Sequence, residues 1–244
     1  MSDTREIERD VAHRPWPLPT EPWLMFQSWR DLLFMHWPVP IDMLRPLIPG
    51  QLALDTHNGT AWVGIAPFRI AGVRAHMLPP LPGLSDFPEL NVRTYVRYGD
   101  KPGVWFFSLD TPNQIAVLAA RIGYHLPYNA ADLRIETSAG WHNCTCERGA
   151  ATLAVRYKPT GAPRTAEPGS LDYFLTERYA LFVLKDDEVM RGDIHHKPWQ
   201  LQPAIAELSR NTMATAHGIT LPEQSPMLHF AAQQDTLIWR LRHA

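Results

Sequence analysis

Phe87-Pro-Glu-Leu-Asn-Val-Arg-Thr-Tyr-Val-Arg97 is the stretch of sequence that decides the fold. After Pro88 its polar and apolar residues alternate, which is the period of a β-strand. One face of this strand carries Glu89, Asn91, Arg93, Tyr95 and Arg97, and the other carries Leu90, Val92, Thr94 and Val96. The polar face lies either in solvent, which is the commoner arrangement, or along a wet internal cavity. Because Glu, Asn, Arg and Tyr are side chains that orient a ligand, this mixture favours the cavity.

Outward from this strand, further strand-like runs outnumber helical ones. The runs are short, rich in β-branched or aromatic residues, and bounded by Gly, Pro, Asp or Asn. In chain order they span residues 24–35, 61–73, 90–98, 104–109, 133–137, 139–147, 152–157, 179–185, 189–195, 228–232 and 236–241. Hairpin turns are predicted at residues 146–149, 185–188 and 233–235. Many short strands with long proline loops predict a mainly β fold of the α+β class, either a barrel or a sandwich.

Three helices are predicted, and the clearest spans residues 112–122. Thr111 is its predicted N-cap, a proline occupies its first position, and Gly123 follows its end. Its apolar residues at helical spacing predict a face that packs against a sheet; they are Ile115, Leu118, Ala119 and Ile122. Shorter helices are predicted at residues 170–177 and 204–216.

The composition is that of a globular domain. The chain has 244 residues, of which 45% are hydrophobic, and a formal net charge of -2. The lack of a basic excess argues against nucleic acid as a partner, and no apolar run approaches the ~18 residues that a membrane span needs. Residues 1–22 are predicted to form an extended N-terminal arm, and residues 23–244 a single β-barrel domain. Because the charged N-terminus is unlike a signal peptide, we expect a cytoplasmic location.

A set of longer motifs occurs in one order between about residues 24 and 242. Besides the stretch quoted above, they are Trp62-Val-Gly-Ile-Ala-Pro-Phe68, Leu78-Pro-Pro-Leu-Pro-Gly83, Gly103-Val-Trp-Phe-Phe-Ser-Leu-Asp110, Gly169-Ser-Leu171, Leu175-Thr-Glu-Arg-Tyr179 and Gly192-Asp-Ile-His-His-Lys-Pro-Trp199. With these motifs the chain resembles the YqjF-like family of uncharacterised bacterial proteins, a branch of the acetoacetate decarboxylase-like superfamily. The resemblance implies a cone-shaped β-barrel with a few peripheral helices and an internal small-molecule cavity.

The resemblance also bears on catalysis, because similar decarboxylases use a lysine Schiff base with a second lysine beside it. That lysine pair aligns with Tyr128 and Asn129, and neither side chain can form an imine. Decarboxylation through a lysine Schiff base is therefore not expected. The resemblance further matches Glu89 to a cavity glutamate, and Arg30 to an arginine that binds the substrate carboxylate.

Two histidine segments are further candidates. In the pair His195-His196, neighbouring strand residues point to opposite faces, so at most one enters a given cavity; His195 is taken as a substrate-binding candidate. His125 lies three residues before Tyr128 and is a candidate acid–base partner for it. Its alternative role is that of a histidine favoured at a helix C-terminus by the helix dipole. No histidine spacing supports a metal site, and no cofactor is expected.

Three functions remain open from the sequence. The first is a cofactor-independent enzyme, of the lyase or hydratase type, acting on a small carbonyl or carboxylate compound. Glu89 would be its acid and base, Tyr128 and His125 its proton donors, and Arg30, Arg93, Asn129 and His195 its substrate-binding residues. The second is a binding protein without turnover for an apolar or aromatic acid. The third is an interaction module whose proline loops at residues 36–50 and 78–88 contact a partner or a second copy, the latter making a homo-oligomer.

Overall fold

Strands make up most of the regular structure in the computed structural model, which describes residues 4–80 and 85–244. They are β1 (Met25–Val39), β2 (Ala53–Leu54), β3 (Ala61–Ala75), β4 (Phe87–Tyr98), β5 (Lys101–Thr111), β6 (Tyr128–Ala130), β7 (Asp132–Ser138), β8 (Trp141–Arg148), β9 (Ala151–Pro159), β10 (Ala180–Lys185), β11 (Glu188–His196), β12 (Gln202–Asn211), β13 (Met227–Ile238) and β14 (Arg242–His243). The helices are α1 (Thr4–Arg9), α2 (Ile41–Leu44), α3 (Gln114–Tyr124) and α4 (Leu171–Thr176), with 3-10 turns at Arg45–Leu47 and Thr215–His217. The predicted mainly β fold is confirmed.

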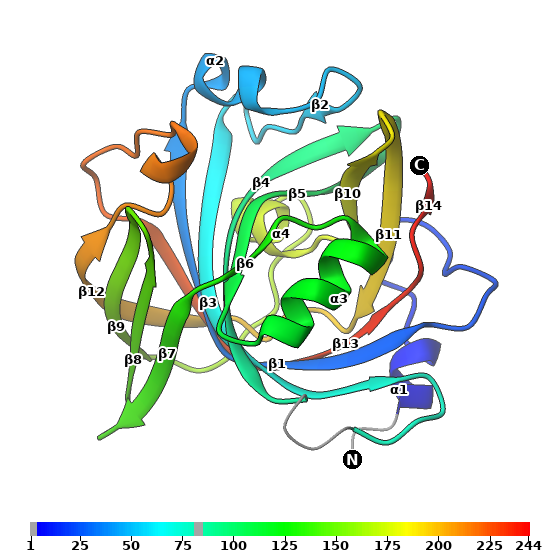
Figure 1. The fold of residues 1–244 in the computed structure, drawn as a ribbon, viewed down its shortest axis with the longest axis horizontal. Helices are drawn as coiled ribbons and strands as arrows, with labels where there is room; N and C mark the ends of the chain where they lie inside the picture. The colour runs from blue at the N-terminus through cyan, green and yellow to red at the C-terminus, as the bar shows by residue number, and fades with distance from the viewer. Residues whose placement is uncertain (1–3, 81–84) are drawn as a thin grey trace.

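Part of the sheet closes on itself (Figure 1). Its strand order is β14-β11-β10-β5-β4-β3-β1-β13-β12-β9-β8-β7. A further antiparallel pairing joins β11 to β13, with Ile194 opposite Ile238. The strands from β11 through β5 and β1 to β13 therefore form a closed circuit, as the wall of a barrel does. Helix α3 lies across this circuit in the view of Figure 1.

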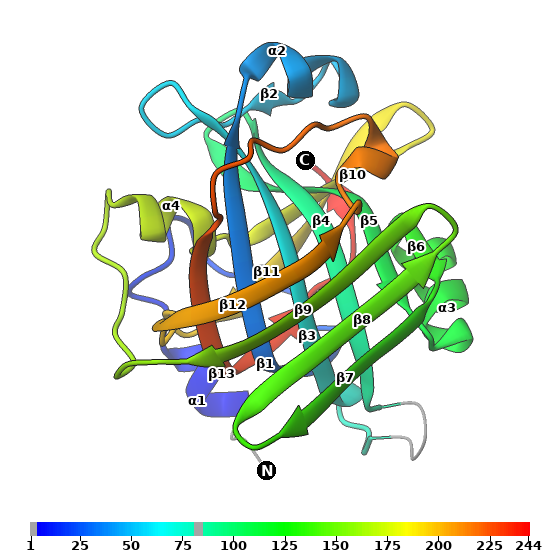
Figure 2. The same cartoon turned by 90° about the vertical axis from the view of Figure 1, so that its left-hand side faces the viewer.

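Strands β12, β9, β8 and β7 form a second layer. Figure 2 shows β12, β9, β8 and β7 crossing in front of β1, β3 and β4. Buried apolar side chains from both layers form one core cluster, which includes Val63 and Val92 from the barrel and Cys144 and Val155 from the second layer. The apolar face of β4 is thus directed outward into this core, and its polar face is directed into the barrel.

Helix α3 differs from its prediction in both its ends and its packing. Asn113, not Thr111, is the N-cap, since its side chain accepts hydrogen bonds from the backbone N–H groups of Ile115 and Ala116. The helix extends past Gly123 to a left-handed C-cap at His125. The predicted sheet-facing residues Ile115, Leu118 and Ile122 are 58%, 61% and 70% exposed. Packing instead uses the opposite face, where Val117 and Tyr124 are buried.

Two predictions about the last third of the chain are wrong. Residues 204–216 are not a helix, because Gln202–Asn211 form β12 and pair with β9 and β13. The exposure of residues 202–207 alternates, as in a strand with one face toward solvent, and tertiary pairing has overridden local propensity. Residues 233–235 are not a hairpin turn, because β13 continues through them in register with β1. The hairpins at residues 146–149 and 185–188 and the helix α4 are confirmed.

The N-terminal arm is not extended throughout. Thr4–Arg9 form the helix α1, and Ile7 is buried. Beyond it, Arg14 donates to the Ile194 carbonyl at 2.6 Å, and Trp16 Nε1 donates to Asp193 at 2.9 Å. Residues 1–3, and residues 81–84 of the predicted proline loop 78–88, lie outside the described residues. Within the described ranges, no helix has the length and apolar character needed to cross a membrane.

Candidate functional site

The polar face of β4 lines an internal cavity. Glu89, Asn91 and Arg93 all border this cavity, whose volume is about 460 Å³. The sequence left open whether the polar face of this strand lies in solvent or along an internal cavity, and in the structure it lies along the cavity. Tyr95 is fully buried beyond the cavity, and Arg97 reaches Asp55 outside it. Three of the five polar residues therefore share one space.

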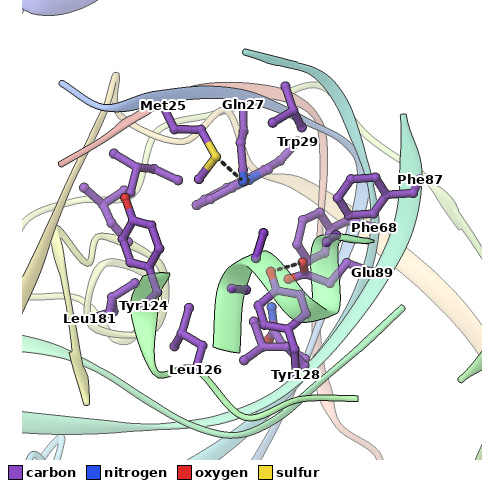
Figure 3. A pocket seen from close by; sticks show the side chains of 18 of the residues that line it. Met25, Gln27, Trp29, Phe68, Phe87, Glu89, Tyr124, Leu126, Tyr128 and Leu181 are labelled. Carbon is purple, nitrogen blue, oxygen red and sulfur yellow. Dashed lines mark hydrogen bonds between the residues drawn. The ribbon is translucent and has the colours of Figure 1, made fainter. Parts of the chain in front are cut away.

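The rest of the wall is mainly apolar (Figure 3). β1 contributes the alternate residues Met25, Gln27 and Trp29. Trp29 Nε1 donates to Gln27 Oε1 at 2.7 Å, which fixes the amide against the indole. Other lining residues come from β3, from β10 and from the end of α3 with the loop after it; those drawn in Figure 3 include Phe68, Leu181, Tyr124 and Leu126. Such a lining suits a ligand with a substantial apolar part.

The cavity has an open end and a closed end. Leu78 and Ile115 line it and are 60% and 58% exposed, so the cavity reaches the surface beside them. Thr111 lies four residues before Ile115 and donates to the Pro88 carbonyl at 2.8 Å, which places the open end at the start of β4. Arg93 lies further along β4, toward the closed end.

Glu89 and Tyr128 form a buried hydrogen-bonded pair in the cavity wall. The Tyr128 hydroxyl donates to Glu89 Oε2 at 2.5 Å, and the two side chains are drawn together in Figure 3. Strand β6 places Tyr128 there. This strand pairs with β5 in a parallel arrangement, and Tyr128 lies opposite Leu109. The two residues are 39 positions apart in the sequence. Only the folded sheet brings them together.

The surroundings of Glu89 shift its protonation toward neutral pH. The carboxyl is 3% exposed, and burial raises its pKa to about 7 because the charged form loses its hydration. Hydrogen bonds from Tyr128 and Asn91 act in the opposite direction, and the charge of Asp110 adds to the increase. Burial and the neighbouring Glu89 raise the pKa of Tyr128 well above its ordinary value. At neutral pH the tyrosine is therefore a hydroxyl donor, and Glu89 is close to half ionised.

Arg93 is the main polar group on β4 at the closed end. Its guanidinium lies 5.1 Å from the ring centroid of Phe34 and 5.9 Å from that of Tyr95. Its Nη2 makes a long contact of 3.5 Å to the Leu175 carbonyl. Its buried Nε has no hydrogen-bond partner, and no carboxylate of the described residues forms an ion pair with it.

A second arginine, Arg178, borders the same end of the cavity. It forms a buried ion pair with Asp55 at 2.6 Å and donates to the Phe174 carbonyl at 2.7 Å. Burial lowers its pKa, and the charge of Asp55 opposes that change. The guanidinium lies 4.9 Å from the Tyr95 ring centroid, so one tyrosine packs against both Arg93 and Arg178.

The histidine that reaches the cavity is His196, and the prediction of His195 is wrong in its placement. His196 lines the cavity, and its Nδ1 lies 2.8 Å from the Lys197 carbonyl. Burial lowers its pKa to about 4, so it is neutral at neutral pH. His195 faces the N-terminal arm instead, with Nε2 2.7 Å from the Ile7 carbonyl. The alternation of strand side chains separates the two, as predicted, but only the fold shows which one enters.

Three other predicted site residues lie outside the cavity. Arg30 is exposed on the outer face of β1 and contacts Ser28. His125 is exposed at the C-cap of α3, the alternative position considered for it, and does not contact Tyr128 as an acid–base partner. Asn129 accepts a hydrogen bond from Arg121 on the surface. These placements follow from side-chain direction, because Arg30 and Asn129 each neighbour a cavity-facing residue in a strand.

The four lysines do not border the described part of the cavity wall. Lys101 pairs with Asp100 and Lys197 pairs with Glu6, both toward solvent. No group of three or more His, Cys, Asp or Glu side chains in residues 4–80 and 85–244 is arranged to hold a metal ion.

Sequence reasoning missed several cavity residues. Gln27 and Trp29 lie on the strand face opposite to Arg30, so extending the alternation along β1 could have found them. Arg178 lies within the motif 175–179 that carried the family resemblance. Trp199, whose Nε1 is buried without a partner, likewise lies within the motif 192–199.

The sequence of this chain is similar to that of a protein family and of one bacterial protein. It matches the model of the DUF2071 family, described as "Uncharacterized conserved protein (COG2071)", over residues 26–235. It is 50% identical over 228 residues to "Uncharacterized protein YqjF" of Bacillus subtilis (strain 168), covering 92% of this chain and 94% of that protein.

Solved structures with a similar fold are more distant in sequence. Acetoacetate decarboxylase from Legionella pneumophila has a TM-score of 0.62 at 14% identity, covering 98% of this chain and 94% of that one. The enduracididine biosynthesis enzyme MppR, in a complex with pyruvate, has a TM-score of 0.62 at 10% identity, covering 94% and 93%. These likenesses establish an acetoacetate decarboxylase-like fold.

Proposed function

The chain belongs to the DUF2071 family, and on that premise we propose that it is a cofactor-independent enzyme with Glu89 as its general acid and base. Its substrate would be a small carbonyl or carboxylate compound bound in the cavity. The observation that carries the proposal is the buried Glu89–Tyr128 pair bordering that cavity, with a carboxyl pKa of about 7.

A carboxyl with that pKa suits acid–base catalysis at neutral pH, because both of its protonation states are then populated. Ionised Glu89 would remove a proton from the carbon next to a carbonyl group, and the C–H electron pair would move into the enolate. The carboxylic acid so formed would return a proton to carbon or oxygen in the next step. Tyr128 would keep the carboxyl in place through Oε2.

The proposal differs from Schiff-base decarboxylation, since no lysine is found among the described lining residues. MppR, which shares the fold at low identity, was solved with pyruvate and with a condensation product of pyruvate and imidazole 4-carboxaldehyde. Carbonyl compounds are the class that we propose for this chain.

A second candidate function is binding without turnover, for an apolar or aromatic acid. The mainly apolar wall favours it, with Trp29, Phe68 and Trp199 among the lining residues. Such a protein would need the arginines and aromatic rings but no acid–base pair.

The test compares wild type with Glu89→Gln on a panel of ketones, keto acids and unsaturated acids. Proton exchange next to the carbonyl is followed by NMR in deuterium oxide, and addition or elimination of water by mass spectrometry. We expect Glu89→Gln to lower the rate about 100-fold or more, while Glu136→Gln, on the exposed face of β7, leaves it unchanged. Ligand binding with no turnover in wild type, or full turnover in Glu89→Gln, would overturn the enzyme proposal.

A further inference from the structure

The closed end of the cavity contains a cation without a counter-ion. Arg93 has no carboxylate partner among the described residues, and its buried Nε donates to nothing. Its guanidinium is instead packed against the rings of Phe34 and Tyr95. Arg93 is half-buried, and a guanidinium with a buried, unpartnered Nε and no carboxylate beside it can pair with an anion that enters the cavity.

Further unpaired donors lie in side chains that line the same end. Arg178 is neutralised by Asp55, yet its Nη2 is buried without a hydrogen-bond partner. The indole Nε1 of Trp199, a residue 2% exposed, is also unpaired. Tyr95 packs against both guanidinium groups, which keeps Arg93 and Arg178 in one neighbourhood.

The charged side chains of the cavity wall also favour an anionic ligand. The basic side chains along the described wall are Arg74, Arg93 and Arg178, and the acidic one is Glu89. Asp55 offsets the charge of Arg178 from outside the cavity. The wall therefore has an excess of positive charge, which complements an anionic ligand.

Glu89 and Arg93 are separated along the cavity. Four residues of a strand place their Cα atoms about 13 Å apart. The length of the arginine side chain shortens the distance between the Glu89 carboxyl and the Arg93 guanidinium. A ligand would need a carbon chain of roughly six to nine bonds to reach from one group to the other. An anion at Arg93 would thus be remote from an atom that reacts at Glu89.

We infer that Arg93 and Arg178 form an anion subsite at the closed end of the cavity, and that the ligand is an organic acid of medium length. Its carboxylate binds at this subsite, and its apolar chain extends toward the open end past Glu89. Resting on the proposed function, the inference also states that the reacting carbonyl is distant from the carboxylate. The carboxylate is an anchor and not a leaving group.

The first experiment measures binding alone, by calorimetry and by tryptophan fluorescence, to which Trp29 and Trp199 of the cavity wall contribute. The probes are hexanoate, octanoate, decanoate and dodecanoate, each compared with its methyl ester. We expect wild type to bind a carboxylate at least about tenfold more tightly than the matching ester. Equal binding of acids and esters would overturn the subsite whatever the variants do.

The second experiment repeats these titrations with Arg93→Met, which keeps the length of the side chain without its charge. The preference for acids over esters should disappear in Arg93→Met, and persist in part in Arg93→Lys. Arg134→Met, at an exposed arginine of β7, should keep the full preference. A preference that survives in folded Arg93→Met would place the anion elsewhere and overturn the inference.

The third experiment tests where the reaction occurs, by proton exchange in 4-oxodecanoate and 9-oxodecanoate. We expect faster exchange next to the distant carbonyl of 9-oxodecanoate, and the opposite order would overturn the remote-anchor arrangement. If acids bind through Arg93 but neither compound exchanges, the anion subsite stands and the proposed acid–base function fails. If exchange depends on Glu89 while Arg93→Met still prefers acids to esters, the proposed function stands and the subsite fails.

Discussion

The molecule contains two buried glutamate–tyrosine pairs, Glu89–Tyr128 and Glu177–Tyr179, which resemble each other in composition but not in setting. In both, the tyrosine hydroxyl donates to a glutamate Oε2, and burial raises the pKa of the carboxyl. Glu89 is 3% exposed and Glu177 is 6% exposed. Burial alone therefore does not distinguish them.

What distinguishes the pairs is the second partner of each carboxyl. Glu177 Oε1 accepts the backbone N–H of Trp199 at 2.9 Å, and Glu177 is not among the described cavity-lining residues. Glu89 borders the cavity, and its other neighbour is the Asn91 side chain. The first carboxyl is held by fixed main chain and the second by side chains that can rotate. The comparison indicates that Glu177 connects segments of the fold, whereas Glu89 is available to a ligand.

The largest expected contrast is in stability at pH 8, where Glu89→Gln and Glu177→Gln should act in opposite directions. The pKa of Glu89 is raised from 4.5 to about 7, so between these pH values the folded protein binds more protons than the unfolded chain. Stability therefore falls as pH rises through this window. Glu89→Gln should remove that fall, a gain of up to about 3 kcal/mol above pH 7.

Glu177→Gln should instead destabilise the protein by about 1–3 kcal/mol, because the lost hydrogen bond outweighs the relief from removing a carboxyl whose pKa is raised less than that of Glu89. Glutamine has one acceptor oxygen, so either Tyr179 or the fixed N–H of Trp199 loses its acceptor. In Glu89→Gln the unpaired Asn91 Oδ1 offers an acceptor to the new amide. Denaturant unfolding at pH 5 and pH 8 checks both variants, and a change of the same sign in both would break the comparison.

A smaller contrast is expected between Tyr128→Phe and Tyr179→Phe. The Tyr128 hydrogen bond lowers the pKa of Glu89, so its removal should raise that pKa further. Tyr179→Phe should leave the pKa of Glu89 unchanged. Carbon NMR of labelled glutamate carboxyls over pH reports the values directly. Equal shifts of Glu89 in both variants would show that the two pairs are coupled.

The smallest effect is expected from Arg30→Met. This variant tests whether an arginine must face the cavity to contribute to ligand binding. Arg30 is exposed on the outer face of β1. Its replacement should change stability by less than about 0.5 kcal/mol and leave the binding of decanoate unchanged. Titration of decanoate beside Arg93→Met provides the check, and a loss of binding in Arg30→Met would return that residue to the site.

Alternation along β4 allowed the residues that share its polar face to be predicted from local sequence, because side-chain direction in a strand has period two. The same rule separated His195 from His196. It could not choose between them, since the absolute orientation of a strand depends on what packs on each side. Residues 204–216 show the complementary failure, because pairing with β9 and β13 and not intrinsic propensity makes β12 a strand.

The sequence by itself determined that Glu89, Asn91 and Arg93 share one face, and that the strand bearing them has an apolar opposite face. Only the tertiary structure decided that this face is internal, because closure requires β11 to pair with β13 across a long sequence separation. It also placed Tyr128 against Glu89, through a three-residue strand added in parallel to β5. Local periodicity specifies directions, whereas contacts between distant segments arise from packing and hydrogen bonding that no local pattern encodes.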